Sequence, residues 1–358
     1  MAADRNAEQL RATLQKVAPG TELRTGLERI LRAETGALVV LGDSPTVGAV
    51  SSSGFAIDEE FTPQRLSELA KMDGAIVVSE DAARIVRANV HLVPDHTIPT
   101  QESGTRHRTA ERVARQTGYP VVAVSQSMKI VSLYVDSTKW VLEDVTAVLA
   151  RANQALQTLE RYKQRLNEVS ANLLALEVED LATLRDAITV VQRIEMVRRI
   201  SDEVEALVIE LGSEGRLMRL QLDEMMGGVE TERRMLVRDH IAPRRGRSLE
   251  TVLNEMAALS PEDLLDPAAI AKVLGHQVTP EALDAASSPR GYRLLSRIPR
   301  LPASVVDRIV SDFGRLPKIM AASIDDLLAV EGVGAARASS VKDGLIRLAE
   351  SSILDRYL

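Results

Sequence analysis

The chain has 358 residues, of which 45% are apolar and 27% charged, and its formal net charge is −7. This length has room for two or three domains, and the charge argues against a protein that is basic throughout, although a local basic patch stays possible. There is no cysteine, which excludes disulfides and thiolate metal sites. A charged, amphipathic N-terminus and the lack of an apolar run of about 18 residues predict no signal peptide and no membrane span, and therefore a cytoplasmic protein.

Residues 1–140 alternate short apolar runs with helical patterns, which predicts an α/β domain with a mixed sheet. Runs rich in β-branched residues predict strands over 37–42, 75–79, 84–93, 120–125 and 130–135. Thr62 and Pro63 predict the start of one helix, as N-cap and first helical residue. A second predicted helix ends at Gly118.

Residues 141–290 lose the strand pattern and predict an all-α linker or spine domain. A coiled-coil-like seam repeats every seven residues at Val145, Ala152, Leu159, Leu166 and Leu173. Breaks follow at Gly212, at Gly227–Gly228 and at residues 242–247. We expect this region to act as a spacer without chemistry of its own.

Residues 291–358 form a short all-α domain in the prediction. They carry ten Lys and Arg against eight Asp and Glu, so this region is slightly basic in an acidic chain. That sign suits a polyanionic partner.

The most informative stretch for chemistry is residues 102–118. Arg106, His107 and Arg108 crowd the start of a predicted helix, where free N–H groups and the helix dipole already favour anions. Such cations make sense if a phosphate chain neutralises them. A solvated basic loop is the open alternative for these three residues alone.

Asp73 and Gly74 precede the predicted strand that starts at Ala75. An ordinary Asp-Gly turn explains this pair by itself. Together with the basic cluster, the carboxylate favours metal-assisted phosphoryl or nucleotidyl transfer, with Asp73 holding Mg²⁺ or Mn²⁺ and drawing the proton from an attacking hydroxyl. The arginines would stabilise charge on the transferred phosphate.

The combination of "KMDGA", "ANVHLVPD", "GTRHRTAE" and "VSQSMKIVSLYV" resembles the diadenylate cyclase family. The resemblance continues through the helical linker into a C-terminal helix-hairpin-helix region, as in the branch of the family that binds DNA. It implies condensation of two ATP into cyclic di-AMP with release of two diphosphates. It also implies signalling of DNA damage, with a protein associated with the nucleoid.

The resemblance also implies site residues. Asp73 would be the metal ligand and activator of the ribose 3′-hydroxyl, and Gly74 would admit the nucleoside. The Leu92 backbone would line the adenine pocket. The triphosphate would be bound by Thr105, Arg106, His107, Arg108 and Thr109, with help from Ser125. Relatives carry basic residues at positions 127 and 128, where this chain has Ser and Met, so Lys129 is only a candidate for the second nucleotide.

The reaction predicts an assembly, because the chain has one DGA and one RHR. Each new ester joins two equivalent nucleotides, so two subunits related by a two-fold axis must supply one ATP each. The family resemblance implies an octamer.

The C-terminal region carries a Gly332-Val333-Gly334 hairpin. It resembles the helix-hairpin-helix motif, in which bare N–H groups hold a DNA phosphate without reading bases. We expect Val333 to be its buried anchor, and Arg337 and Lys342 to contact the backbone of DNA, with branched or junction forms favoured. A weaker copy spans residues 313–316. A hairpin that only packs is the open alternative.

Two other functions remain open from sequence. One is a DNA-binding structural protein whose nucleotide domain senses ATP without turning it over. The other is a nucleotidyltransferase that modifies a separate acceptor. A product assay separates all three.

Overall fold

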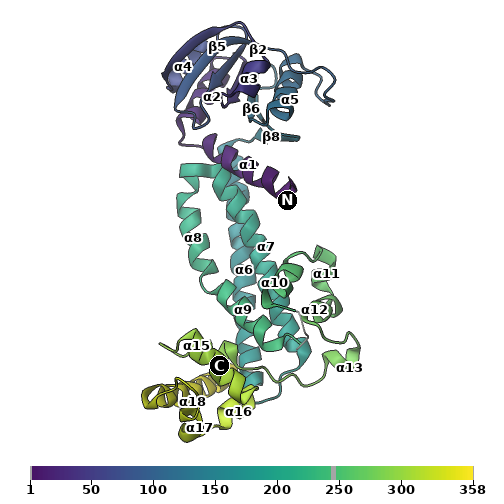
Figure 1. Ribbon diagram of the computed structural model, residues 1–358, viewed down its shortest axis with the longest axis vertical. Helices are drawn as coiled ribbons and strands as arrows, with labels where there is room; N and C mark the ends of the chain where they lie inside the picture. The colour runs from purple at the N-terminus through teal and green to yellow at the C-terminus, as the bar shows by residue number, and fades with distance from the viewer. Residues whose placement is uncertain (1, 243–246, 358) are drawn as a thin grey trace. The chain divides into compact units, whose positions relative to one another are not determined.

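The computed structural model describes residues 2–242 and 247–357 (Figure 1), so most of the break predicted at 242–247 lies outside the described residues. The chain packs as two compact units, Met1–Gln154 with Glu203–Gln221, and Ala155–Asp202 with Leu222–Leu358. This is a division by packing, and the domain boundaries near 140 and 290 stay a prediction.

The first unit holds an eight-stranded mixed sheet in the order β2-β5-β4-β1-β6-β7-β8, with β3 pairing on β5. Only β1 and β4 run parallel; their neighbours pair antiparallel. The predicted α/β domain with a mixed sheet is therefore confirmed. The strands are β1 (Ala37–Leu41), β2 (Ser51–Ser52), β3 (Phe55–Glu60), β4 (Ala75–Val78), β5 (Arg84–Leu92), β6 (Val121–Ser125), β7 (Ile130–Val135) and β8 (Thr138–Leu142).

The five predicted strands are all present, and β2, β3 and β8 are additional. β3 is exposed along most of its length and is acidic at its end, so it lacks the apolar alternation by which a strand is recognised. β8 alternates between half-buried and exposed residues but is only five residues long.

Helices cover both faces of this sheet. One face packs against α1 (Ala2–Lys16), α2 (Glu22–Arg32) and α4 (Pro63–Leu69), and the other against α3 (Pro45–Ala49) and α5 (Thr105–Thr117). Val39 and Leu41 of β1 enter the first core, whereas Leu38 and Val40 enter the second, as the two-residue period of a strand requires. Thr62 caps α4 and Gly118 ends α5 in the left-handed conformation, as predicted.

The region after β8 is helical, as predicted. Its first helix, α6 (Val145–Val178), buries Ala152, Leu159, Leu166 and Leu173 of the predicted seam. The following helices are α7 (Leu184–Leu211), the 3₁₀ turn η1 (Gly212–Gly215), α8 (Arg216–Met226), α9 (Val229–His240), α10 (Leu249–Ala257), α11 (Pro261–Leu265), α12 (Pro267–Leu274) and α13 (Pro280–Leu283).

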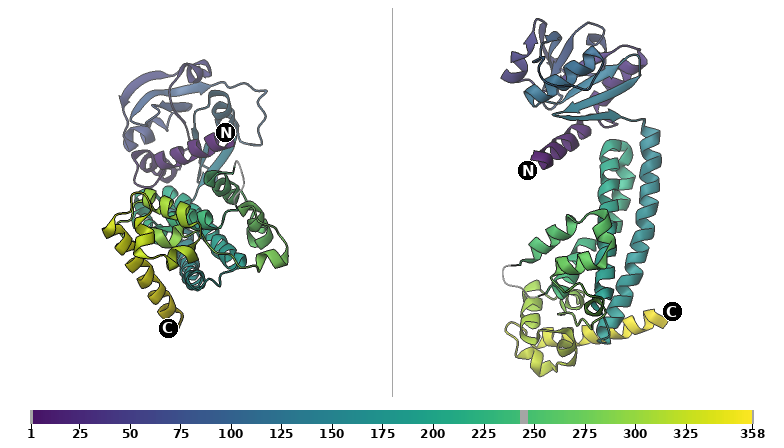
Figure 2. Two further views of the ribbon diagram at one scale, coloured as in Figure 1. Left: turned by 60° about the horizontal axis from the view of Figure 1, so that its bottom comes forward. Right: turned by 90° about the vertical axis from the view of Figure 1, so that its right-hand side faces the viewer.

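The C-terminal part is also helical. It comprises α14 (Tyr292–Ser296), α15 (Ala303–Phe313), α16 (Leu316–Ala321), α17 (Ile324–Leu328) and α18 (Ala335–Tyr357). Figure 2 shows these short helices gathered at the C-terminal end of α6, and Leu174 of α6 belongs to their core. Within the described part of the chain, every helix is too short or too polar to cross a lipid bilayer.

A buried charge cluster in the second unit was not expected from the sequence. Glu177 of α6 and Arg293 of α14 are each 1% exposed and form an ion pair. Arg293 Nη1 also donates to Ser170 Oγ at 3.1 Å, and the second carboxylate oxygen of Glu177 lies 3.2 Å from His240 Nε2. The cluster ties α6, α9 and α14 together.

Candidate active site

Three of the predicted site residues, Asp73, Leu92 and Ser125, lie at one edge of the sheet. The parallel register of β1 on β4 pairs Val39 with Ile76, so the two strands begin at the same edge. Gly36 directly precedes β1, and Asp73 stands two residues before the start of β4. β6 runs antiparallel to β1 with Val124 opposite Ala37, which places Ser125 opposite Gly36. Because neighbouring strands lie about 4.8 Å apart, the strand ends at Asp73, Gly36 and Ser125 form one row.

Leu92 ends β5, which pairs antiparallel with β4. The end of β5 therefore meets the beginning of β4 at the same edge. The Leu92 side chain is buried in the core beneath α5, so only its backbone is available at this edge. Its place in an adenine pocket stays a prediction from the family resemblance.

Asp73 lies in the short turn between α4 and β4. Its carboxylate is exposed and makes no hydrogen bond or ion pair with the described residues, whereas its backbone carbonyl accepts from Asn89 Nδ2 at 2.6 Å. An exposed carboxylate without a partner is free to bind a cation. Asn89, which the sequence gave no reason to single out, holds the turn against β5.

Gly74 is required here by the protein's own backbone. Its φ is +99°, and a Cβ at this position would lie 2.9 Å from the carbonyl carbon of Asn89 and 3.0 Å from the Val90 oxygen. Only glycine adopts this conformation and tolerates this approach without strain. The sequence assigned this glycine to nucleoside access; the close approach of β5 is a sufficient reason by itself.

The basic cluster occupies the first turn of α5. Gly104 is the N-cap and offers no side-chain cap to the free amides of that turn, so the helix start can bind an anion. Thr105 and Arg108 are exposed and Thr109 is half-buried. Arg108 makes no side-chain hydrogen bond or ion pair within the described residues.

Arg106 reaches from α5 to the row of strand ends. Its Nη1 donates to the Val124 carbonyl at 3.5 Å, and it lies so close to Gly36 that a Cβ there would stand 2.2 Å from it. Gly36 directly precedes β1 and Asp73 precedes β4, which pairs with β1, so the guanidinium and the carboxylate lie at the same edge of the sheet. Gly36 is a site residue that the sequence analysis missed, because an isolated glycine before a strand carries no distinctive signal.

His107 points the other way. It is only 7% exposed, and its Nδ1 lies 2.8 Å from the hydroxyl oxygen of Tyr134 on β7. Burial lowers the pKa of His107, which Glu102 opposes and Lys139 and Arg106 reinforce. The imidazole is therefore packed between α5 and the sheet.

Ser125 and Lys129 are both engaged at the β6–β7 turn. Ser125 Oγ accepts from the Met128 amide at 3.3 Å and is 3.4 Å from Ser127 Oγ. Lys129 Nζ forms an exposed ion pair with Glu34 at 2.7 Å, and this contact lowers the pKa of Glu34. Lys129 would have to leave Glu34 to meet a phosphate.

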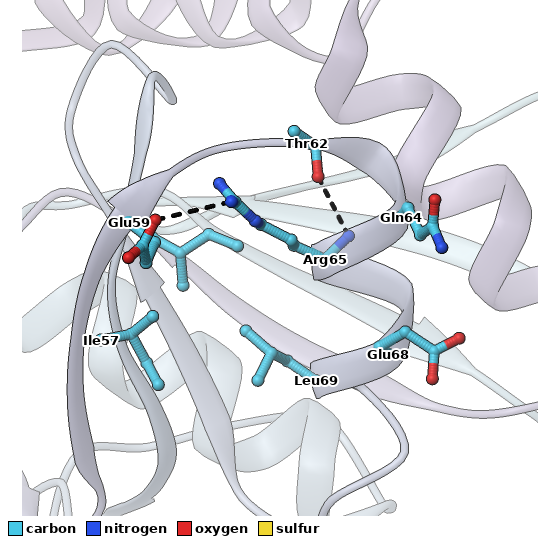
Figure 3. A pocket seen from close by; sticks show the side chains of 8 residues that line it. Ile57, Glu59, Thr62, Gln64, Arg65, Glu68 and Leu69 are labelled. Carbon is cyan, nitrogen blue, oxygen red and sulfur yellow. Dashed lines mark hydrogen bonds and ion pairs between the residues drawn. The ribbon is translucent and has the colours of Figure 1, made fainter.

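Two hollows of the first unit contain none of the predicted site residues. The larger, of 500 Å³, lies between β3 and α4 (Figure 3). There the Arg65 amide donates to Thr62 Oγ1, and the Arg65 guanidinium forms an ion pair with Glu59. The other, of 390 Å³, lies beside α5 and is lined in part by Glu102, Tyr134 and Lys139. Neither hollow opens on the row of strand ends.

The described residues contain no group of three or more histidine or acidic side chains able to hold a metal ion by themselves. Asp73 alone fits a different kind of site. Mg²⁺ is commonly held by one or two carboxylates, with substrate phosphates and water completing its octahedron.

The C-terminal hairpin joins α17 to α18. Gly332 has φ +82°, Val333 is buried, and the Gly334 carbonyl accepts from the amides of Arg337 and Ala338. Two exposed arginines flank it, because Arg337 donates to the Gly332 carbonyl at 2.8 Å and Arg308 to the Glu331 carbonyl at 2.9 Å. The sequence analysis missed Arg308, which lies on α15 and is distant in sequence from the hairpin.

Lys342 is placed differently from Arg337. Its ammonium is half-buried and donates to the carbonyls of Met320 and Ala322, at 3.0 and 2.8 Å. These bonds cap the C-terminal end of α16, so Lys342 has a structural partner already.

Residues 24–139 match the family model described as DisA bacterial checkpoint controller nucleotide-binding, and residues 142–283 match the DisA bacterial checkpoint controller linker region. A DNA integrity scanning protein DisA from Acidothermus cellulolyticus is 60% identical over 359 residues, covering 99% of this chain and 97% of that protein. The chain belongs to the DisA family. DisA proteins of Parafrankia sp. and Streptomyces avermitilis are 61% and 58% identical, covering 97% and 98% of this chain and 97% and 94% of theirs.

Membership of the DisA family confirms the resemblance seen in the sequence. The chain is a diadenylate cyclase, with ATP as the substrate of its nucleotide-binding domain. The predicted helical linker corresponds to the second matched region.

Proposed function

We propose that this DisA protein condenses two ATP into cyclic di-AMP and two diphosphates at the row of strand ends formed by Asp73, Gly36 and Ser125. The convergence of an unpartnered carboxylate, a guanidinium and a free helix start at one sheet edge supports this site. Nucleotidyl transfer needs a base or metal at the attacking hydroxyl and positive groups at the phosphate, and this edge offers both.

Each residue has a role in this proposal. Asp73 would hold Mg²⁺ or Mn²⁺, and its carboxylate accepts the proton of the ribose 3′-hydroxyl. The metal, when bound, would neutralise charge on the phosphates. The amides of the first turn of α5, with Thr105, Arg106, Arg108 and Thr109, bind the triphosphate, and Ser125 assists. Gly74 and the Leu92 backbone shape the nucleoside pocket.

The reaction also requires a second copy of the chain. One Asp73 and one basic cluster serve one ATP, so the partner ATP must come from a subunit related by a two-fold axis; we propose the octamer of the family resemblance as the full assembly. Specific activity should therefore fall as the protein is diluted through its dissociation range. Activity per chain that is independent of concentration down to a proven monomer would refute the shared site.

We further propose that the Gly332–Gly334 helix-hairpin-helix binds the DNA backbone without reading sequence, with branched or junction DNA preferred, at the nucleoid. Bare amides at the start of α18, with Arg308 and Arg337 beside them, support a phosphate site. Lys342 is the weaker contact, since its ammonium caps α16. Turnover by the full chain with and without junction DNA tests coupling to DNA-integrity signalling; an unchanged rate at saturating DNA would refute it.

A further inference from the structure

A buried polar contact between His107 and Tyr134 joins the first turn of α5 to the sheet. His107, the middle residue of the basic cluster, is buried, and its Nδ1 is 2.8 Å from the Tyr134 hydroxyl. Tyr134 is 1% exposed and lies on β7, opposite Val121 of β6 and Lys139 of β8. This contact joins the helix that carries the arginines to the centre of the fold.

The contact continues outward to Glu102, in the loop before α5. Its carboxylate forms an ion pair with Lys139 at 2.6 Å and interacts with the Tyr134 hydroxyl. Burial, reinforced by Glu102, raises the pKa of Tyr134, which therefore stays a neutral phenol. A carboxylate can only accept. A Tyr134 hydroxyl that donates toward Glu102 leaves its own oxygen to accept from His107 Nδ1–H.

This direction of donation fixes the state of the imidazole. With the proton on Nδ1, Nε2 is a bare acceptor, and it is buried without a hydrogen-bond partner in the described part of the chain. A second proton on Nε2 would bury an unsatisfied donor and add a charge near Arg106 and Lys139. The arrangement holds together only while His107 is neutral.

We propose that Tyr134 and Glu102 are positioning residues of the cyclase: through His107 they fix the first turn of α5 on the sheet and so direct its free amides, Arg106 and Arg108 toward the triphosphate. This rests on the proposed site at the strand ends. His107 itself is then a positioning residue, and the two arginines make the phosphate contacts.

Glu102 and Lys139, the residues of this contact network farthest from His107, can be substituted. Glu102 and Lys139 line the 390 Å³ hollow beside α5, so both side chains can be changed without repacking a core. The charged groups facing His107 are Glu102 from the loop, Lys139 from β8 and Arg106 from α5 itself. The first two influence the imidazole with opposite signs, which gives the test its control.

The first experiment measures kcat against pH for the full-length protein. Activity falls as pH falls through the pKa of His107, because protonation breaks the contact with Tyr134. Glu102→Gln removes a group that raises this pKa, so the acid limb moves to lower pH; Lys139→Met removes one that lowers it, so the limb moves to higher pH, each by roughly half a pH unit. Shifts of equal sign would overturn the proposal.

The second experiment is a double-mutant cycle at one pH. Tyr134→Phe lowers kcat roughly tenfold, and in a His107→Leu background it has no further effect, because the residue through which it acts is gone. Independent, multiplicative losses would show a merely structural role and overturn the proposal. Tyr119→Phe, which removes a phenol hydroxyl elsewhere in the same domain, stays within about twofold of wild type.

The two proposals fail in different ways. A wild-type protein that makes no cyclic di-AMP refutes the proposed site chemistry. In that case the double-mutant cycle of Tyr134→Phe and His107→Leu is repeated with the affinity for a non-hydrolysable ATP analogue as the measured quantity. A productive wild type whose Tyr134→Phe variant is equally active at every pH leaves the cyclase intact and refutes the positioning role.

Discussion

Replacing Arg293 by Met should destabilise the second unit strongly. Glu177 would keep its place in the core but lose the guanidinium that neutralises it, retaining only His240 at 3.2 Å. Removing one partner of a buried ion pair costs about 3–5 kcal/mol, because the remaining charge is left without compensation. Met fills most of the space of the arginine stem, so the cost is mainly electrostatic.

The cost should depend on pH. Burial raises the pKa of Glu177, but Arg293 and His240 outweigh it, and the pKa in the folded wild type is lowered. A carboxyl group whose pKa is lower in the folded protein than in the unfolded chain stabilises the fold at pH values above its unfolded pKa. This stabilisation is lost as the pH falls through the folded pKa. In Arg293→Met, burial dominates and raises the pKa of Glu177 in the folded protein above its unfolded value. Protonation of Glu177 at low pH then removes the unpaired buried charge, so acidification stabilises this variant. The free-energy difference between variant and wild type should therefore narrow as pH falls.

Urea unfolding of the full chain, followed by far-UV circular dichroism, measures this cost through the midpoint of the helical transition. Arg185→Met is the matched control: it breaks an exposed ion pair with Asp284 in the same unit, worth at most about 1 kcal/mol. Glu177→Leu combined with Arg293→Met should recover most of the loss, because neither member of the pair is then left buried without its partner. If Arg293→Met costs no more than Arg185→Met, the buried pair is not the anchor described.

Three further predictions follow from the geometry. Gly74→Ala should lower the free energy of unfolding by about 2 kcal/mol or more, because the φ of Gly74 is +99° and the backbone of β5 leaves no room for a Cβ. Gly48→Ala, with open space around it, is the control and should leave stability unchanged or slightly raised in thermal unfolding. Gly36→Ala should leave stability within about 1 kcal/mol of wild type but weaken ATP binding in calorimetry, since only a flexible guanidinium must move; unchanged affinity would contradict the shared edge. Arg337→Ala should reduce the salt dependence of DNA binding by about one phosphate contact, while Lys342→Met should reduce it less and lower stability through the lost cap; the reverse order would contradict the hairpin assignment.

The sequence predicts much of the first domain, for identifiable reasons. Five strands are recognisable because each is rich in β-branched residues. Of these, β1, β4 and β6 are buried on both faces. Thr62 and Gly118 mark helix ends by local chemistry alone. β3 escapes prediction because its exposed, acidic sequence reflects an edge position that only the assembled sheet defines.

The candidate site is predicted by motif and incompletely by geometry. That Asp73 and Arg106 share an edge depends on the register of β1 against β4, a long-range pairing that no local pattern encodes. Gly36 gains its role only through that pairing, and Asn89 only through the pairing of β5 with β4. His107 reads as one more cation of the cluster, yet the structure buries it on Tyr134, whose position 27 residues later is brought close by the sheet.

The charge cluster of the second unit could not be read from the sequence either. Arg293 and Glu177 are 116 residues apart and each resembles an ordinary surface residue in its local context. Only the packing of α14 on α6 makes them a buried pair.

The most direct test of the central claim compares wild type with Asp73→Asn in ATP and Mg²⁺ or Mn²⁺, with cyclic di-AMP and diphosphate measured by mass spectrometry. The wild type should form one cyclic dinucleotide for every two diphosphates released. Asp73→Asn should form none while still binding ATP, because the arginines and the helix start remain. Undiminished cyclic di-AMP from Asp73→Asn would contradict the site, and ATP binding without diphosphate release by the wild type would favour a sensor over an enzyme.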